Sequence, residues 1–111
     1  MINYTTPTIY LTVENVDLSG QKDVYVSLEQ FGLELTKSGE DITVSTTTHD
    51  QITDTNISVP LTQEESAAFE FGKEVQVQVN WIDSQGVRDA TEIKKIKVFR
   101  NLLDEVISYG D

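Results

Sequence analysis

Apolar and polar residues alternate along most of this chain with a period of two, which is typical of β-strands that bury one face. The clearest run is VQVQVNW at 75–81, where three valines and a tryptophan alternate with two glutamines and an asparagine. Shorter alternating runs begin near residues 8, 24, 31, 42, 57 and 87, and turn-forming residues separate them. About seven short strands spaced in this way predict an all-β, immunoglobulin-like β-sandwich over residues 1–100.

Two stretches predict details of these strands and loops. In FGLELTK, the alternation places Phe31, Leu33 and Leu35 on the inward face of a strand. The stretch TTTHDQITDTN at 46–56 is the most polar part of the chain, and Ile52 is its one large apolar residue. A strand without an apolar face has nothing to bury, so we expect a loop over 46–56.

The basic residues of the last strand support two further predictions. The apolar positions of EIKKIKVFR change parity between Ile93 and Ile96, which predicts a β-bulge near Lys94–Lys95. The same segment holds the one basic cluster of the chain, Lys94, Lys95, Lys97 and Arg100. Lysines on an edge strand prevent other sheets from pairing with it. We therefore interpret the cluster as a set of charges that keeps an exposed sheet edge from aggregating.

One segment interrupts the strand pattern. LTQEESAAFEFG at 61–72 contains Thr62 and Glu65 at the spacing of a capping box, in which each residue bonds the backbone of the other. Gly72 is suited to end the helix. About eight residues are too few for an isolated helix, so tertiary packing must hold it. We expect one short helical crossover at 62–70, which joins the two sheets and caps the open end of the core.

The C-terminal segment NLLDEVISYGD, residues 101–111, is compatible with two structures. Its large apolar residues would share one face of a helix, and they are Leu102, Leu103, Val106 and Ile107. The segment is short and ends without a cap, so it forms either a small amphipathic helix or an arm that pairs with a neighbouring subunit. If the segment is an arm, these four side chains are the ones expected to contact the partner.

The net charge restricts the partners of the protein. Nineteen acidic and eight basic residues give a net charge of −11. Nucleic acids and anionic membranes are recognised by basic side chains that neutralise phosphate, so we expect neither as a partner. No signal-peptide pattern stands at the N-terminus, and no apolar run approaches the roughly 18 residues of a membrane span. We therefore expect a soluble protein that stays in the cytoplasm where it is made.

The residues offer little for catalysis or metal binding. The absence of cysteine excludes disulfides, thiolate metal sites and cysteine nucleophiles. His49 is the single histidine, and on an extended chain Asp50 points to the opposite face, so the pair does not predict a catalytic triad. Asp50, Asp54 and Asn56 are the one candidate set for Ca²⁺, which needs about six to eight oxygen ligands. We predict no catalytic residue, no cofactor and no metal.

Side chains on the outer faces of the strands suggest another kind of contact. Tyr10 and Tyr25 would lie on neighbouring strands if the first two strands pair. They would then form a cross-strand aromatic pair, or contact a partner protein or a glycan. The row of Gln76, Gln78 and Asn80 is similarly either a solvated face or a surface that binds a glycan.

Three segments together resemble a known group of proteins. They are TTPTIYLTV, ISVPLTQEESAAFEFGKEVQVQVNW and DSQGVRDATEIKKIKV. Their combination resembles small β-sandwich structural and morphogenesis proteins of tailed phages and prophages of Gram-positive bacteria, over roughly residues 5–107. It is more loosely similar to the N-terminal domain of phage baseplate proteins. The shared motif contains no catalytic residue.

The resemblance implies a non-enzymatic virion structural or assembly protein. Such a protein acts through contacts with other virion proteins or with copies of itself, first in the cytoplasm of the bacterial host and then in the virion. The alternative is a β-sandwich binding module, receptor-binding or baseplate-like, for a glycan or a host-surface component. The first function predicts association that depends on residues 101–111, and the second predicts saccharide binding by a monomer.

Overall fold

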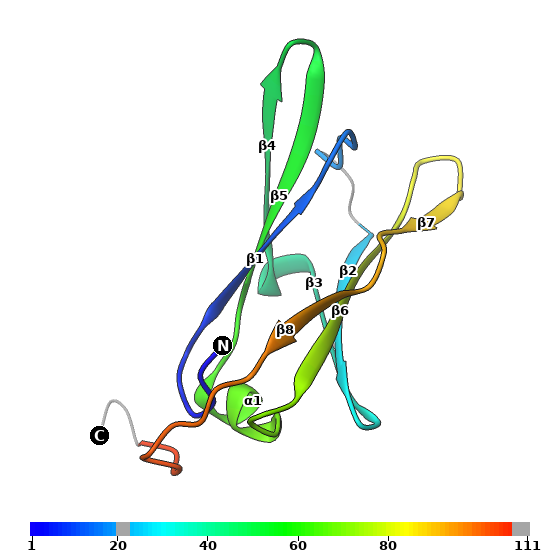
Figure 1. Cartoon of the computed structure of the whole chain (residues 1–111). Helices are drawn as coiled ribbons and strands as arrows, with labels where there is room; N and C mark the ends of the chain where they lie inside the picture. Colours follow the sequence, from blue (N-terminus) through cyan, green and yellow to red (C-terminus); the bar gives the residue numbers. More distant parts are fainter. Residues whose placement is uncertain (20–22, 108–111) are drawn as a thin grey trace.

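The computed structural model describes residues 1–19 and 23–107 of the chain. Two antiparallel sheets lie face to face, together with one short helix, α1 (Gln63–Ala68), and one 3-10 turn, η1 (Gly39–Asp41) (Figure 1). The predicted all-β sandwich is therefore confirmed. The three-stranded sheet has the order β1 (Thr8–Val13), β5 (Ile52–Pro60) and β4 (Thr43–His49). The five-stranded sheet has the order β3 (Leu33–Ser38), β2 (Val24–Gln30) and β6 (Glu74–Ile82), and β6 then pairs with both β7 (Arg88–Ala90) and β8 (Lys94–Lys97).

The strand order is that of an immunoglobulin-like sandwich. β1, β5 and β4 occupy the places of strands B, E and D, and β3, β2, β6 and β7–β8 occupy those of C′, C, F and G. The helix α1 lies between β5 and β6, where the chain crosses from one sheet to the other. In the described part of the chain, the N-terminal segment forms no strand beside β1, and Ile2 instead makes a parallel bridge with Phe99 after β8.

Alternate side chains of both sheets form the core, as their sequence pattern predicted. Val26, Leu28, Val59 and Val75 are each 0% exposed. Phe69 follows α1 directly, and with 1% of its surface exposed it closes one end of the core. Burying a large apolar side chain contributes roughly 1.5–3 kcal/mol, so this alternation supplies the main stabilisation of the sandwich.

The predicted loop at 46–56 is wrong, because these residues belong to the hairpin of β4 and β5. The hairpin extends beyond the rest of the sandwich (Figure 1), so its outer part needs no apolar face. Threonine favours extended backbone, and the hydroxyls of Thr48 and Thr53 hydrogen-bond across the pair at 2.8 Å. Asp50 and Gln51 have φ of 50° and 66°, the left-handed backbone of a two-residue hairpin turn.

The inward face predicted for Phe31, Leu33 and Leu35 is only partly correct. Phe31 lies in the β2–β3 turn with φ of 49° and is 73% exposed, so its predicted burial is wrong. Leu35 stands opposite the buried Leu28 and packs against the core, and Leu33 has the same parity but is 40% exposed. The reason is position: β3 is an edge strand, and its first residue lies where the sandwich ends.

The predicted bulge exists, but not at Lys94–Lys95. Asn80 pairs with Ala90 and Val77 pairs with Lys94, so three steps along β6 match four steps along the partner chain. The extra residue therefore lies between β7 and β8. There the Oγ1 atom of Thr91 accepts a hydrogen bond from the Val79 amide at 3.1 Å, which replaces a ladder bond and divides the strand in two.

Candidate interaction surface

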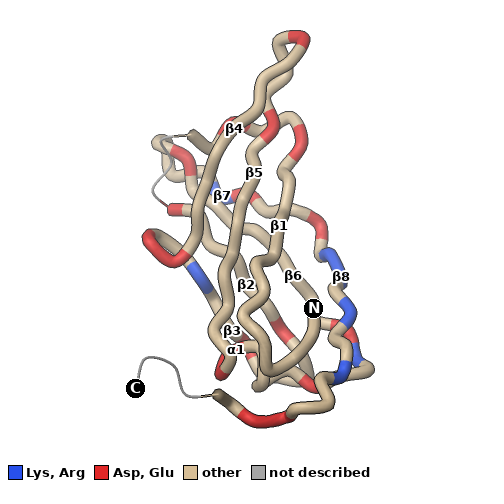
Figure 2. Tube along the Cα trace, turned by 90° about the vertical axis from the view of Figure 1, so that its left-hand side faces the viewer, with Lys and Arg blue, Asp and Glu red and all other residues tan. Residues whose placement is uncertain are grey.

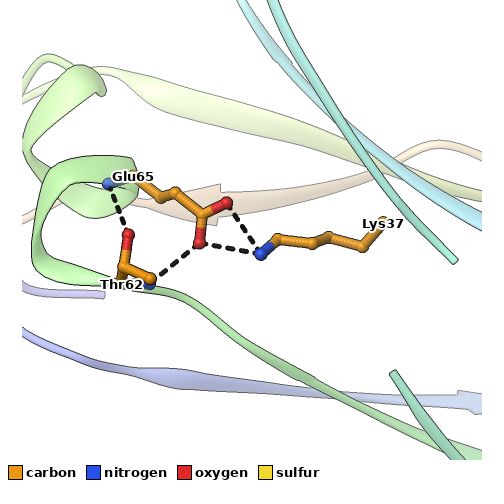
Figure 3. A network of polar contacts seen from close by, with 3 residues as sticks. All are labelled: Lys37, Thr62 and Glu65. Carbon is orange, nitrogen blue, oxygen red and sulfur yellow. Dashed lines mark hydrogen bonds and ion pairs between the residues drawn. The ribbon is translucent and has the colours of Figure 1, made fainter. Parts of the chain in front are cut away.

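The helix α1 begins with the predicted capping box. The Thr62 Oγ1 atom accepts a hydrogen bond from the Glu65 amide at 3.1 Å, and the Thr62 amide donates to the Glu65 carboxylate at 2.9 Å (Figure 3). The same carboxylate binds the Nζ atom of Lys37 on β3, at 2.8 and 2.7 Å from its two oxygens. This is the one ion pair within the residues that the structure describes, and it joins α1 to the edge of the five-stranded sheet.

The surroundings of Glu65 act on its ionisation in opposite directions. Burial raises the pKa of Glu65, but the hydrogen bonds from Lys37 and Thr62 and the charge of Lys37 outweigh that effect. The net result is a pKa below the ordinary value of the group. The carboxylate is therefore charged at neutral pH and stabilises both the first turn of α1 and its contact with β3.

Three polar side chains fix the backbone around α1, each through two hydrogen bonds. Gln30 binds both the amide and the carbonyl of Glu70, at 2.6 and 2.9 Å. Ser66 binds the amide and the carbonyl of Thr5, at 3.1 and 2.6 Å. Gln63 binds the amide and the carbonyl of Ile107, at 2.8 and 3.1 Å. We call these contacts the backbone clamps.

The backbone clamps bring distant segments of the chain to one end of the sandwich, the α1 end. There the β2–β3 turn, the N-terminal segment and the C-terminal segment all surround α1 (Figure 1). Ser66 is fully buried and Gln30 is 5% exposed, so two of the three clamps are shielded from water. Such bonds hold their partners firmly, because a buried polar group without its partner costs about 1–3 kcal/mol.

The C-terminal segment is described up to Ile107. Residues 101–107 form neither a helix nor a strand, so the helical alternative is wrong for this part, and residues 108–111 lie outside the described residues. The segment folds back on the protein, because its Asn101 amide donates to the Asn3 side chain at 3.0 Å and its Ile107 backbone is clamped by Gln63.

Large exposed apolar side chains gather at the α1 end. Among the described residues fifteen large hydrophobic side chains are exposed, and nine of them lie there: Ile2, Phe31, Leu33, Phe71, Phe99, Leu102, Leu103, Val106 and Ile107. The four partner residues predicted in the C-terminal segment belong to this group, and Leu102 is the most exposed of them at 87%. Single exposed apolar residues are ordinary, but a gathering of them typically marks a surface that contacts another molecule.

Sequence patterns did not single out the other five members of this group. Phe31 and Leu33 were assigned to the core, and Ile2, Phe71 and Phe99 belong to no amphipathic pattern. Only the folding of the β2–β3 turn and of both chain ends around α1 brings them together.

An apolar groove lies between β3 and α1 at this end. It has a volume of about 250 Å³ and is lined by Leu33, Leu35, Ala68 and Phe69, with the side chains of Glu34, Glu64 and Glu65 at its border. Glu65 is paired with Lys37, whereas Glu34 and Glu64 are exposed and form no ion pair with any residue that the structure describes. We call this feature the acidic groove.

A second feature of opposite charge lies beside β8. The Lys97 Nζ atom is 5.6 Å from the centre of the Phe99 ring, and the Arg100 guanidinium is 5.7 Å from the centre of the Phe71 ring. Both rings are about half exposed. Figure 2 shows the basic segments gathered along β8 and the chain that follows it. We call Phe71, Lys97, Phe99 and Arg100 the aromatic–basic patch.

Tyr10 and Tyr25 do not form the pair that the sequence suggested. β1 and β2 belong to different sheets, so the two tyrosines lie on opposite outer faces of the sandwich. The reason is the immunoglobulin-like order, in which the chain crosses between sheets from strand B to strand C, here from β1 to β2. Tyr10 is 77% exposed and Tyr25 is 38% exposed, so either can contact a partner alone but not both together.

Tyr25 is instead part of a polar surface on the five-stranded sheet. It stands opposite Asn80, and the next row pairs Ser27 with Gln78. Two neighbouring hollows of about 240 and 310 Å³ cover this face and share Ser27, Asn80 and Arg88 in their linings. The linings combine uncharged hydrogen-bonding groups with two aromatic rings, Tyr25 and Trp81, and with the charged side chains of Glu29, Glu34 and Arg88. Such a combination suits a polar organic ligand. We call this surface the polar groove.

Two of the three candidate Ca²⁺ ligands bind other groups of the protein. The Asp54 carboxylate accepts a hydrogen bond from the Asn15 amide at 2.9 Å, and the Asn56 side chain bonds Thr12 and Thr47 on the neighbouring strands. Asp50 stands in the turn at the tip of the hairpin. Within residues 1–19 and 23–107, no three His, Cys, Asp or Glu side chains are grouped so that they could hold a metal ion.

Comparison of the chain with protein-family models, with curated proteins and with solved structures found no match. None of the helices in the described ranges has the length and apolar character that crossing a membrane requires.

Proposed function

We propose that this protein is a non-enzymatic structural or assembly protein of a tailed-phage or prophage virion, and that it acts through protein–protein contacts at its α1 end. The observation that carries the proposal is the gathering of nine exposed apolar side chains on a protein with a net charge of −11. The high charge keeps the isolated protein dispersed, while a matching partner covers the apolar surface.

The backbone clamps support this function, because they hold the exposed side chains on a defined backbone. A partner that binds a preorganised surface loses less conformational entropy than one that must order its target. The clamp between Gln63 and Ile107 joins the C-terminal segment to α1 in this way. The virion setting comes from the resemblance of the three sequence segments to phage morphogenesis proteins.

The test is affinity capture from bacteria in which the virion is being assembled, with identification of the bound proteins by mass spectrometry. The full chain is expected to recover virion proteins or copies of itself. A variant with serine at the four apolar positions of the C-terminal segment is expected to lose them: Leu102→Ser, Leu103→Ser, Val106→Ser and Ile107→Ser. A wild-type protein that recovers no virion protein and remains monomeric would overturn the proposal.

A second candidate function is saccharide binding, which the polar groove favours. Tyr25 offers a ring on which a sugar can stack, and Gln78, Asn80 and Arg88 offer hydrogen-bonding groups beside it. Titration of the protein with oligosaccharides, followed by NMR, tests this function. Tyr25→Ala is expected to abolish binding, whereas Tyr10→Ala on the opposite sheet is the matched control and leaves it unchanged. Absence of shifts around Tyr25 with every saccharide class would eliminate this candidate.

A further inference from the structure

The acidic groove and the aromatic–basic patch have complementary chemistry. The groove offers an apolar lining with two carboxylates at its border, Glu34 and Glu64, which have no ion-pair partner within residues 1–19 and 23–107. The patch offers two half-exposed phenylalanine rings with two cations, Lys97 and Arg100, beside them. A ring that enters the groove would bury apolar surface on both sides, and the cation beside it would reach a carboxylate.

The two features lie on opposite edges of the same sheet. β3 forms one edge of the five-stranded sheet and lines the groove, whereas β8 belongs to the other edge and leads into the patch. Both stand at the α1 end (Figure 1). One molecule therefore cannot bring its own patch into its own groove, but a second copy placed beside it can do so.

The distribution of charge favours a second copy as the occupant. Two molecules that each carry a net charge of −11 repel one another unless their contact joins unlike charges. Basic residues are few, and four of the eight, Lys94, Lys95, Lys97 and Arg100, follow one another along the β8 edge. Residue pairs in which a carboxylate faces a cation across a partly apolar contact fix both the partner and its orientation.

We propose that the acidic groove of one copy binds the aromatic–basic patch of the next, so that copies associate head to tail. This proposal rests on the function proposed above, assembly through protein–protein contacts, and it names the partner and the contact. Because groove and patch are different surfaces on opposite edges, the contact is heterologous. Such contacts repeat, and they produce a closed ring if the rotation between copies closes, or an open chain if it does not.

The experiment is light scattering and sedimentation velocity of the full chain over a concentration series, at about 0.1 M and about 1 M salt. The wild type is expected to associate beyond a dimer at the lower salt. It is expected to dissociate at the higher salt, where the screening length falls to about 3 Å. A wild type that stays monomeric at every concentration would overturn the inference.

Charge reversal identifies the surfaces. The groove variant, Glu34→Lys with Glu64→Lys, and the patch variant, Lys97→Glu with Arg100→Glu, are each expected to weaken self-association by at least about tenfold. Mixed in equal amounts, the two variants are expected to associate again, because the reversed groove then meets the reversed patch. All four residues are exposed, so folding is expected to survive, and circular dichroism checks it.

The control separates a specific contact from a change in net charge. Glu14→Lys with Asp41→Lys alters the net charge by the same amount as the groove variant, at exposed sites away from both surfaces. It is expected to keep self-association. Association that is insensitive to both reversals, or that the mixture fails to restore, would overturn the inference. A monomeric wild type that still captures virion proteins would leave the proposed function standing without it.

Discussion

The α1 end and the hairpin end of the sandwich differ in what holds them and in what they expose. At the α1 end, side chains of β2 and α1 bind backbone groups of the N-terminal segment, of the C-terminal segment and of the chain after α1, and large apolar side chains remain in solvent. At the hairpin end, β4 and β5 are held by an unbroken ladder from Thr43↔Ser58 to His49↔Ile52, and their exposed side chains are mostly threonines. Backbone pairing alone can maintain a polar hairpin, whereas an exposed apolar surface needs tertiary contacts that fix its shape.

At the hairpin end, one side chain makes a similar pair of hydrogen bonds to the backbone. Thr55 is fully buried, and its hydroxyl donates to the Val16 carbonyl at 2.7 Å and accepts from the Leu18 amide at 2.9 Å. It joins the β1–β2 connection to β5 but does not hold the outer part of the hairpin. The two ends therefore differ in how their exposed segments are held, and four predictions test this difference.

The largest expected effect is the loss of stability when a buried side chain is removed at the α1 end, compared with removal of an exposed one in the hairpin. Phe69→Ala removes the ring that closes the core beside α1, and it is expected to lower the free energy of unfolding by about 3–5 kcal/mol. Ile52→Ala, at a 44% exposed position of the hairpin, is the control and is expected to change it by about 0.5 kcal/mol or less. Urea unfolding followed by circular dichroism measures both. Equal losses would contradict the distinction between the ends.

The next largest effect is expected when a buried hydroxyl that binds two backbone groups is removed at either end of the sandwich. Ser66→Ala leaves the Thr5 amide and carbonyl without their partner, and Thr55→Val does the same to Leu18 and Val16, so each is expected to cost about 1–3 kcal/mol. Amide hydrogen exchange distinguishes them, because protection should fall locally at Thr5 in the first variant and at Leu18 in the second. If Ser66→Ala leaves the exchange of Thr5 unchanged, the clamp does not hold the N-terminal segment.

A smaller effect concerns the ion pair between α1 and β3. Glu65→Gln keeps a side-chain acceptor for the helix cap but removes the charge that faces Lys37, so a loss of about 0.5–1 kcal/mol is expected at pH 7. The folded pKa of Glu65 lies below its ordinary value of 4.5. The charged group therefore stabilises the fold above that pH, and this contribution is lost as the pH falls through the folded pKa.

The stability difference between wild type and Glu65→Gln should accordingly shrink in acid. Urea unfolding at several pH values between about 3 and 7 measures it. Glu64→Gln, on the same turn but without a lysine partner in the described part of the chain, is the control. A difference that stays constant down to the lowest pH would show that the charge of Glu65 contributes nothing to stability.

The smallest effect is expected at the tip of the hairpin. Gln51 has φ of 66°, a conformation that glycine adopts without strain, so Gln51→Gly is expected to stabilise the protein by about 0.5–1 kcal/mol. Thermal unfolding detects this as a rise of a few degrees. A decrease in stability would mean that the entropy glycine adds to the unfolded chain outweighs the relieved strain.

The local sequence pattern was sufficient to predict those elements that depend on only a few neighbouring residues. The alternation in VQVQVNW predicted β6 and its buried face, and Thr62 with Glu65 predicted the cap of α1. Parity along the last strand predicted the bulge, although Thr91 placed it three residues earlier. The wrong predictions, the loop at 46–56 and the burial of Phe31 and Leu33, have a common cause. The length by which a strand extends beyond the opposing sheet cannot be predicted from local sequence. Because the outer part of the hairpin extends beyond the opposing sheet, it needs no apolar face. Phe31 and Leu33 are exposed because no part of the opposing sheet covers them.

By itself, then, the sequence determined the fold class, the capped helix and the acidic surface, because each depends on residue type and short-range periodicity. It also marked the apolar residues of the C-terminal segment. Only the tertiary structure decided which surfaces those residues share. Tyr10 and Tyr25 are separated by the crossing of the chain between sheets, whereas Phe31, Phe71 and Phe99 come to the same end of the sandwich, the α1 end. These residues are far apart in sequence, and only the packing of the two sheets fixes which of them lie near one another.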